Sequence, residues 1–280
     1  MKTKALFAEV FIFTLISCFS VYSQETDRIP LTYQSYIAGY GSARVYDTYL
    51  SPLEYKGNNI GLLYEQMKMT GLMNGNISTQ HLFDIEVGRT YNPAGTATDY
   101  TGIMEYDYGL HYRFNPVNKL QLFAGIQADG LFGFIYNNRN GNNPITGKIN
   151  LNLNLSGIAA YKFMIKKQTV KLRCQMNIAI AGCMYSPQFG QSYYEIGLGG
   201  DETLLHFASF HNQLMIKGLL SVELPFDRYA LRLTYMNRFY ETRINNLDTR
   251  MISNSFYIGL SRNFYIVSRK HNNNYLNVFQ

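Results

Sequence analysis

The stretch at residues 100–114 reads YTGIMEYDYGLHYRF and alternates apolar with polar side chains along its length. A period of two is the pattern of a β-strand, because successive side chains of a strand point to opposite faces. One face would be apolar and rich in tyrosine, and the other would carry Glu105, Asp107, His111 and Arg113. A strand with one face in lipid and the other in a polar lumen needs this division.

The same alternation recurs in ten segments of the chain. Segments such as residues 149–163 are long for a soluble, secreted β-sandwich, whose strands usually have about five or six residues. We therefore predict an all-β fold, a single antiparallel up-and-down transmembrane β-barrel of ten strands within residues 24–265. Twelve strands remain an alternative, because the pattern is weak near the N-terminus. The predicted strands are residues 33–45, 58–68, 80–91, 100–114, 120–134, 149–163, 170–184, 212–224, 229–240 and 253–265.

Short and long connections are expected to alternate along the chain. The tight turns at residues 115–118, 164–168 and 225–228 would lie at one end of the barrel, together with both termini. The longer connections, above all residues 186–210, would lie at the other end. Outer-membrane barrels have short periplasmic turns and longer outer loops, so we expect the tight turns to face the periplasm.

The N-terminus has the features of a secretory signal peptide, which we predict for residues 1–23. Lys2 and Lys4 precede a short apolar stretch and then small residues suited to cleavage. Cys18 leaves lipoprotein processing open as an alternative. Residues 266–280 are expected to form a tail after the last strand.

The composition agrees with an exported membrane barrel. The chain has 24 tyrosines, 18 phenylalanines, no tryptophan and 16% charged residues, whereas soluble chains average about 25% charged. Its net charge of +6 includes no basic run dense enough to predict nucleic-acid binding. The expected partners are outer-membrane lipid and the barrel-assembly machinery, since the last strand resembles the C-terminal signal for assembly. That resemblance rests on Phe256, Ile258, Leu260 and Phe264.

Charged residues on the inward-facing parity are separated by sign along the chain. Acids come first and bases later, with Arg113 and Glu223 as exceptions. In a closed ten-stranded barrel the two sets would face each other across a narrow interior, where pairing is favoured over unpaired burial. We predict a largely closed, salt-bridged lumen and a structural or interaction role, with a narrow channel for a small polar solute as the alternative. The predicted network consists of Glu65, Asp84, Glu86, Glu105, Asp107, Asp129, Lys171, Arg173, Lys217, Arg232 and Arg238.

The stretch at residues 47–57, DTYLSPLEYKG, resembles an uncharacterised family of exported Gram-negative proteins, a domain of unknown function. The resemblance is carried by Asp47, Tyr49, Pro52, Tyr55 and Gly57. It implies an outer-membrane barrel over most of the chain and no assigned activity.

The same stretch predicts the first outer loop, because Pro52 cannot donate a ladder hydrogen bond. Tyr49, Leu50, Leu53 and Tyr55 are unusually apolar for a solvated loop. We expect the loop to fold back and cap the barrel mouth, and a ligand contact is the alternative.

Signals for catalysis are weak, and we predict that the chain is not an enzyme. A lipid hydrolase would need a serine and a histidine close together, for which His206, Ser209 and His211 are the candidates. A protease would need paired carboxylates, such as Glu105 and Asp107, to activate water through a histidine such as His111, although any charged lumen face produces such pairs. The sequence predicts no cofactor and no metal site, since no His or Cys cluster has ligand spacing.

Overall fold

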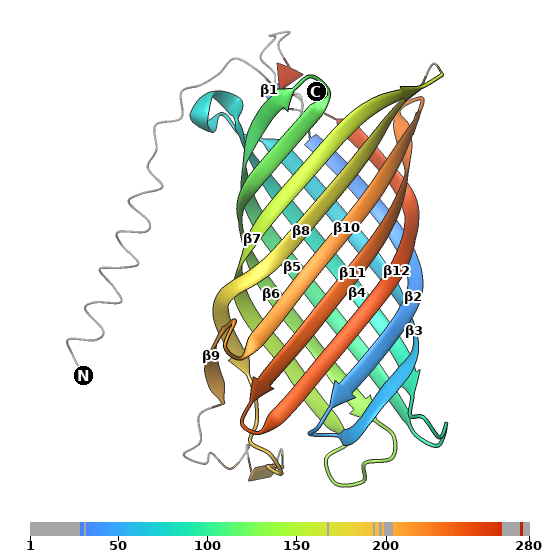
Figure 1. The fold of residues 1–280 in the computed structure, drawn as a ribbon, viewed down its shortest axis with the longest axis vertical. Helices are drawn as coiled ribbons and strands as arrows, with labels where there is room; N and C mark the ends of the chain where they lie inside the picture. The colour runs from blue at the N-terminus through green and yellow to red at the C-terminus, as the bar shows by residue number, and fades with distance from the viewer. Residues whose placement is uncertain are drawn as a thin grey trace, which may run out of the picture.

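Ten long antiparallel strands form a closed barrel in the computed structural model, which describes residues 29–30, 32–166, 168–192, 194–195, 198, 204–264 and 275–276 (Figure 1). The predicted all-β barrel and the count of ten strands are confirmed. The predicted signal peptide, Tyr265 and most of the predicted tail lie outside the described residues. The barrel strands are β2 Thr32–Asp47, β3 Ser51–Met69, β4 Ile77–Tyr91, β5 Thr98–Val117, β6 Leu120–Asn137, β7 Ile145–Ile165, β8 Gln168–Tyr185, β10 Gln213–Phe226, β11 Tyr229–Ile244 and β12 Leu247–Phe264.

The barrel closes between its first and last strands, because β12 pairs with β2 over nearly the whole length of both. Neighbours in sequence pair around the rest of the ring, except at β8, which pairs with β10 along its first part and with the short strand β9 Leu205–Ser209 near its end. Outside the ring, β1 Ile29–Pro30 pairs with β13 Tyr275–Leu276. Within the part of the chain that is described, no helix is long and apolar enough to cross a membrane.

The connections differ from the expected alternation. The turns after β5, β7 and β10 are tight as predicted, and Lys119, Lys166 and Asp227 have the positive φ that such turns require. At the opposite end, however, the connections after β2 and β11 are also short, so the prediction of long loops there is wrong in two places. The predicted loop at residues 186–210 contains β9 in its last part.

The predicted first loop at residues 47–57 is only a turn of three residues, 48–50, because β3 already begins at Ser51. Pro52 lies inside β3 but has no partner in either ladder, where the register with β2 shifts between Val45 and Asp47. Gly57 is an ordinary strand position whose missing side chain allows the Arg89 carbonyl to approach, 2.1 Å from where a Cβ would lie. The prediction of a long capping loop was therefore wrong in length.

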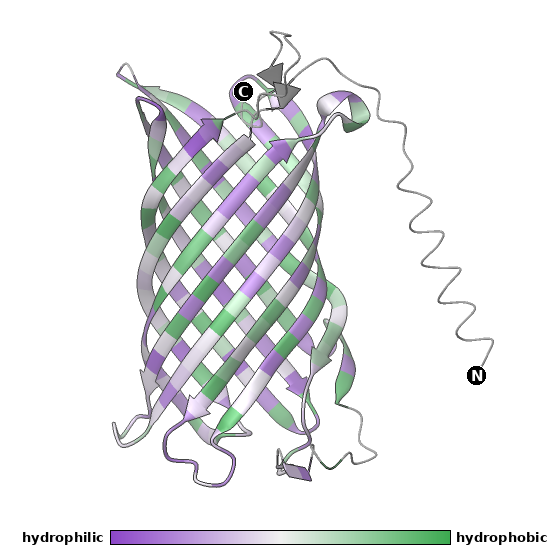
Figure 2. Cartoon of the chain, turned by 180° about the vertical axis from the view of Figure 1, so that it is seen from behind, coloured by the Kyte–Doolittle hydropathy of each residue, from purple (hydrophilic) through white to green (hydrophobic). Residues whose placement is uncertain are grey.

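The two faces of the barrel wall differ in polarity, as the alternation predicts. Figure 2 shows hydrophobic and hydrophilic residues alternating along the strands. On β7, Leu151, Leu153 and Leu155 are exposed on the outside, whereas Asn152 and Asn154 are buried inside the barrel. Because the strand period is two, every strand repeats this division and the barrel has an apolar exterior around a polar interior.

The apolar exterior is bordered by polar side chains on the wall formed by β12, β2 and β3. One border consists of Asn254, Ser42 and Asn58, which are opposite each other in the ladders, and the other of Arg262, Gln34 and Gln66. Tyr235 and Asn237 of β11 donate hydrogen bonds of 2.7 and 2.9 Å to Asn254. On β6, by contrast, every outward residue from Leu120 to Tyr136 is apolar.

Candidate functional site

The lumen contains two layers of buried ion pairs. The first, here called the Glu65 layer, consists of Tyr33, Glu65, Lys171, Arg173, Glu223 and Arg232. Glu65 on β3 accepts charge-assisted hydrogen bonds from Arg173 on β8 at 2.5 Å and from Arg232 on β11 at 2.6 Å. All three side chains are almost fully buried, and the two guanidinium groups cross the interior to reach one carboxylate.

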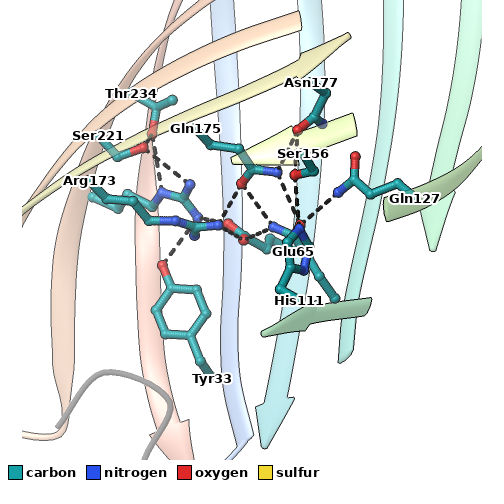
Figure 3. A network of polar contacts seen from close by, with 12 residues as sticks. Tyr33, Glu65, His111, Gln127, Ser156, Arg173, Gln175, Asn177, Ser221 and Thr234 are labelled. Carbon is teal, nitrogen blue, oxygen red and sulfur yellow. Dashed lines mark hydrogen bonds and ion pairs between the residues drawn. The ribbon is translucent and has the colours of Figure 1, made fainter. Parts of the chain in front are cut away.

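Neutral polar side chains complete the hydrogen bonds of the Glu65 layer (Figure 3). Gln80 donates to Glu65 at 2.6 Å, and Arg173 donates to Gln175 at 2.6 Å. Arg232 also reaches the Tyr33 hydroxyl at 3.1 Å, which in turn donates to Glu223. Buried charges are tolerated when they are both paired and hydrogen-bonded, and this layer satisfies both conditions.

The second layer, the Lys217 layer, lies nearer the end with the longer loops and consists of Asp84, Glu86, Glu105, Asp107, Asp129, Lys217 and Arg238. The Lys217 ammonium lies 2.6 Å from Asp107, 2.9 Å from Glu105 and 3.3 Å from Asp84. Arg238 contacts Asp84, Glu86 and Glu105. Acids of β4 and β5 are thus joined to bases of β10 and β11 across the lumen.

Acids outnumber bases in the Lys217 layer. Five carboxylates accompany two cationic groups, which leaves a formal excess of three negative charges when all are ionised. Asp129 has no basic partner among the described residues, and its Oδ1 accepts a hydrogen bond of 2.8 Å from Asn152. Oxygens of Glu105, Asp107 and Asp129 lie within 4.8 Å of one another.

Apolar side chains are buried near both ends of the lumen, beyond the ion pairs. At the end with the longer loops, Tyr49, Leu50 and Tyr55 from the predicted first loop pack in a buried cluster with residues of β5, β6 and β12. Beside that cluster, Lys148 pairs with Asp47 at 2.7 Å. At the other end, Tyr33, Met67, Met69, Phe123, Ile158 and Ala160 form a second buried cluster.

The structure brings most of the predicted network into contact across the barrel, with two departures. Lys171 pairs with Glu223 on the neighbouring strand at 2.6 Å, not with an acid of the opposite wall. Asp129 contacts Asn152, not a base. The ion pairs that do cross the lumen involve Glu65, Asp84, Glu86, Glu105, Asp107, Arg173, Lys217, Arg232 and Arg238.

Sequence reasoning missed the neutral residues of the network and the Asp47–Lys148 pair. Lys148 lies just before the predicted strand at residues 149–163, although it has the inward parity of Asn150 and Asn152 and could have been assigned to their strand. Gln80, Gln127 and Gln175 carry no charge signal, and only their inward parity could have identified them.

The candidate catalytic residues do not assemble into a recognisable site. His111 is buried, and its Nε2 lies 2.8 Å from the Ser156 hydroxyl. His111 is four residues from Asp107 along β5, so the two residues are about 13 Å apart. The exposed Ser209 hydroxyl lies 2.6 Å from Nδ1 of His211, and the same serine belongs to a turn capped by Asn212. Among the described residues, no carboxylate is hydrogen-bonded to His211 to orient its ring, as a catalytic triad requires.

The fold is a closed antiparallel barrel in which the first and last strands are joined. Its exterior is apolar and its interior polar, which is the architecture of the transmembrane β-barrels. The chain belongs to the family described as "Protein of unknown function (DUF3316)", whose sequence profile matches residues 8–271. The resemblance to an uncharacterised family of barrel proteins is thereby confirmed. No curated protein gives a significant sequence match.

Several solved outer-membrane barrels are similar to this chain at low sequence identity. The outer-membrane protease OmpT from Escherichia coli is 10% identical with a TM-score of 0.48, over 88% of this chain and 99% of that one. The translocator domain of the autotransporter NalP from Neisseria meningitidis is 11% identical with a TM-score of 0.41, over 94% and 98%. An outer-membrane channel from Pseudomonas putida F1 is 8% identical with a TM-score of 0.35, over 88% and 100%.

Proposed function

We propose that this protein is an outer-membrane barrel with a closed lumen and a structural or interaction role at the cell envelope. The observation that carries the proposal is the crossing of the interior by two layers of buried ion pairs, capped at both ends by apolar clusters. A ten-stranded lumen is only a little wider than the eight-stranded interior that side chains fill, so these layers leave little room for a solute.

The outer membrane is the location that best suits the wall. An apolar face around a closed barrel needs lipid, and closure removes the unpaired strand edges that a bilayer cannot hydrate. The signal peptide predicted for residues 1–23 and the apolar pattern of β12 support export and recognition by the barrel-assembly machinery. The end with the longer loops would then face outward and the tight turns the periplasm.

A narrow channel for a small polar solute is the second candidate, and one feature favours it. Next to the Glu65 layer, hydrogen bonds join Gln80, Gln127, Gln175, Asn177 and Ser156 inside the lumen (Figure 3). A file of neutral polar groups is a lining along which a solute could exchange hydrogen bonds, provided that the charged layers open. A hydrolase is less well supported than a channel, because the exposed Ser209–His211 pair has no carboxylate hydrogen-bonded to His211 among the described residues.

Planar bilayer recording separates the two candidates. We expect the purified, refolded protein to give no stable discrete current steps, because the ion pairs and apolar clusters block the lumen. Boiled protein from the same preparation is the control for detergent artefacts. Large, long-lived steps whose ion selectivity changes in an Arg238→Ala variant would replace the closed barrel with the channel.

A further inference from the structure

We propose that the Lys217 layer binds one hard cation, best suited to Ca²⁺, on the lumen wall formed by β5, β6 and β7. The first observation is the acidic excess of this layer, in which oxygens of Glu105, Asp107 and Asp129 lie within 4.8 Å of one another. Burying three ionised carboxylates so close together is costly unless a positive charge lies among them. Lys217 supplies one such charge, but it contacts Asp107 through Oδ2 and leaves Oδ1 without a hydrogen bond.

The second observation is independent of the acids and concerns two neutral side chains. Gln127 Oε1 and Asn154 Oδ1 are buried oxygens without a hydrogen-bond donor among the described residues. The Gln127 amide nitrogen donates to Gln80 at 2.8 Å. In Figure 3 its oxygen points away from that bond, toward the side on which Asn177 lies. A buried carboxamide oxygen facing carboxylates cannot be satisfied by them, because all of them are acceptors.

The strand register places these oxygens in one patch. Asp107, Asp129 and Asn152 are opposite one another on β5, β6 and β7, and Gln127 is opposite Asn154 two positions away. Directly opposed side chains in a sheet have Cβ atoms about 4.5–5.5 Å apart. Asp107 Oδ1, Asp129 Oδ2, Gln127 Oε1 and Asn154 Oδ1, all without hydrogen bonds, therefore line a single region of the lumen wall.

The chemistry of the patch selects a hard cation. All the atoms of the patch that could bind a metal ion are carboxylate or amide oxygens, the ligands that Ca²⁺ and Mg²⁺ prefer. Opposed ligands of Ca²⁺ are about 4.6–5.2 Å apart, because each lies about 2.3–2.6 Å from the ion, whereas Mg²⁺ requires about 4.1 Å. The three carboxylate oxygens lie within 4.8 Å of one another, close enough to converge on one ion. Ca²⁺ is favoured because it takes about six to eight oxygen ligands in a flexible geometry, which a patch of carboxylate and amide oxygens can supply, whereas Mg²⁺ keeps several of its waters. The bound ion would reduce the acidic excess and hold β5, β6 and β7 together from inside.

Metal content after refolding tests the site, because a buried ion is captured as the barrel closes. Wild type, Asp129→Asn, Gln127→Leu and the exposed control Asp248→Asn would be unfolded with chelator, refolded with Ca²⁺, gel-filtered and analysed by mass spectrometry. We expect about one Ca²⁺ per chain in wild type and control, none in Asp129→Asn, and at least about tenfold weaker binding in Gln127→Leu. Mg²⁺ refolding should leave less metal bound.

Gln127→Leu keeps the charge of the layer, so it reports on a ligand even if Asp129→Asn fails to refold. The thermal unfolding midpoint should rise with Ca²⁺ in wild type and control, and rise less in Gln127→Leu. The proposal would be overturned if the wild type refolded without bound metal in excess Ca²⁺. It would also be overturned if Gln127→Leu and Asp129→Asn both bound Ca²⁺ like wild type. Neither result depends on whether the lumen conducts.

Discussion

Replacing Lys217 by methionine should destabilise the barrel by about 3–5 kcal/mol, the usual cost of removing one partner from a buried ion pair. Methionine keeps most of the volume of the side chain and removes only the charge and its donors. Asp107 would then have no basic partner among the described residues, because Lys217 is its only ion-pair contact there. The loss should be largest in chelator, where no added cation can compensate.

A second substitution distinguishes the lost charge from a packing defect. Adding Asp107→Asn to Lys217→Met removes the carboxylate left unpaired, so the double variant should regain about half or more of the lost stability. The rim residue Arg243 is exposed, and Arg243→Ala should change stability by no more than about 0.5 kcal/mol. Urea unfolding in vesicles, followed by circular dichroism since the chain has no tryptophan, gives the free energies. If the double variant were as unstable as Lys217→Met, the loss of stability would be due to a packing defect and not to the unpaired charge.

Placing a charge on the lipid face of β7 should cost about 2–4 kcal/mol at mid-membrane and about 0–1 kcal/mol near an interface. Leu153 points outward in the middle of β7, and Ile165 points outward at its end beside the tight turn. Leu153→Arg should therefore impair folding strongly, and Ile165→Arg should fold almost like wild type.

The two variants carry the same substitution on the same face of the same strand, so only depth differs between them. The folded fraction can be read from the gel mobility of unboiled samples refolded into vesicles. Equal folding of Leu153→Arg and Ile165→Arg would mean that this wall does not face lipid. An arginine at the inward position Asn152 would be a poor control, because Asn152 is buried and bonded to Asp129.

The fold was predictable because the side chains of a strand alternate between its two faces, so the polarity of odd and even positions reveals the environment of each face. Each of the ten predicted segments overlaps an observed barrel strand, and the strands extend further mainly toward the end with the longer loops. At that end the prediction of loops was partly wrong, because the strands in fact continue through apolar or turn-forming residues that suggest a loop. The Asn245–Asn246 turn is a two-residue hairpin with positive φ at both positions, and such short turns are encoded by one pair of residues that the strand pattern does not reveal.

The candidate site was predictable in its sign pattern and less so in its partners. Segregated acids and bases on one parity predict contact across a closed barrel, and Glu65 with Arg173 shows the kind of pair expected. Which base meets which acid depends on strand tilt and register, which one sequence does not give. Lys171 therefore paired locally with Glu223, since adjacent strands bring them directly opposite each other. The prediction of no metal site rests on His and Cys spacing, which cannot detect oxygen ligands contributed by three strands, such as those of the proposed cation site.

The polar borders on β12, β2 and β3 have a consequence for the surrounding bilayer. Asn254 and Arg262 are eight residues apart along β12, and Ser42 and Gln34 are equally spaced on β2. At about 3.3 Å per residue and a tilt of about 40°, the apolar height there is about 20 Å, against the usual 25 Å or so. Lipid beside this wall must thin or the barrel must tilt, while β6 accepts a thicker bilayer.

The protein would thus have a thin-membrane side and a thick-membrane side, and stability should depend on lipid chain length through the thin side. Wild type should be more stable in short-chain than in long-chain vesicles, and Asn254→Leu should reduce that preference by extending the apolar height. Equal stability of wild type in both lipids would show that the borders do not set the membrane thickness. Local thinning would make this flank the place where lipids or neighbouring membrane proteins meet the least resistance to rearrangement.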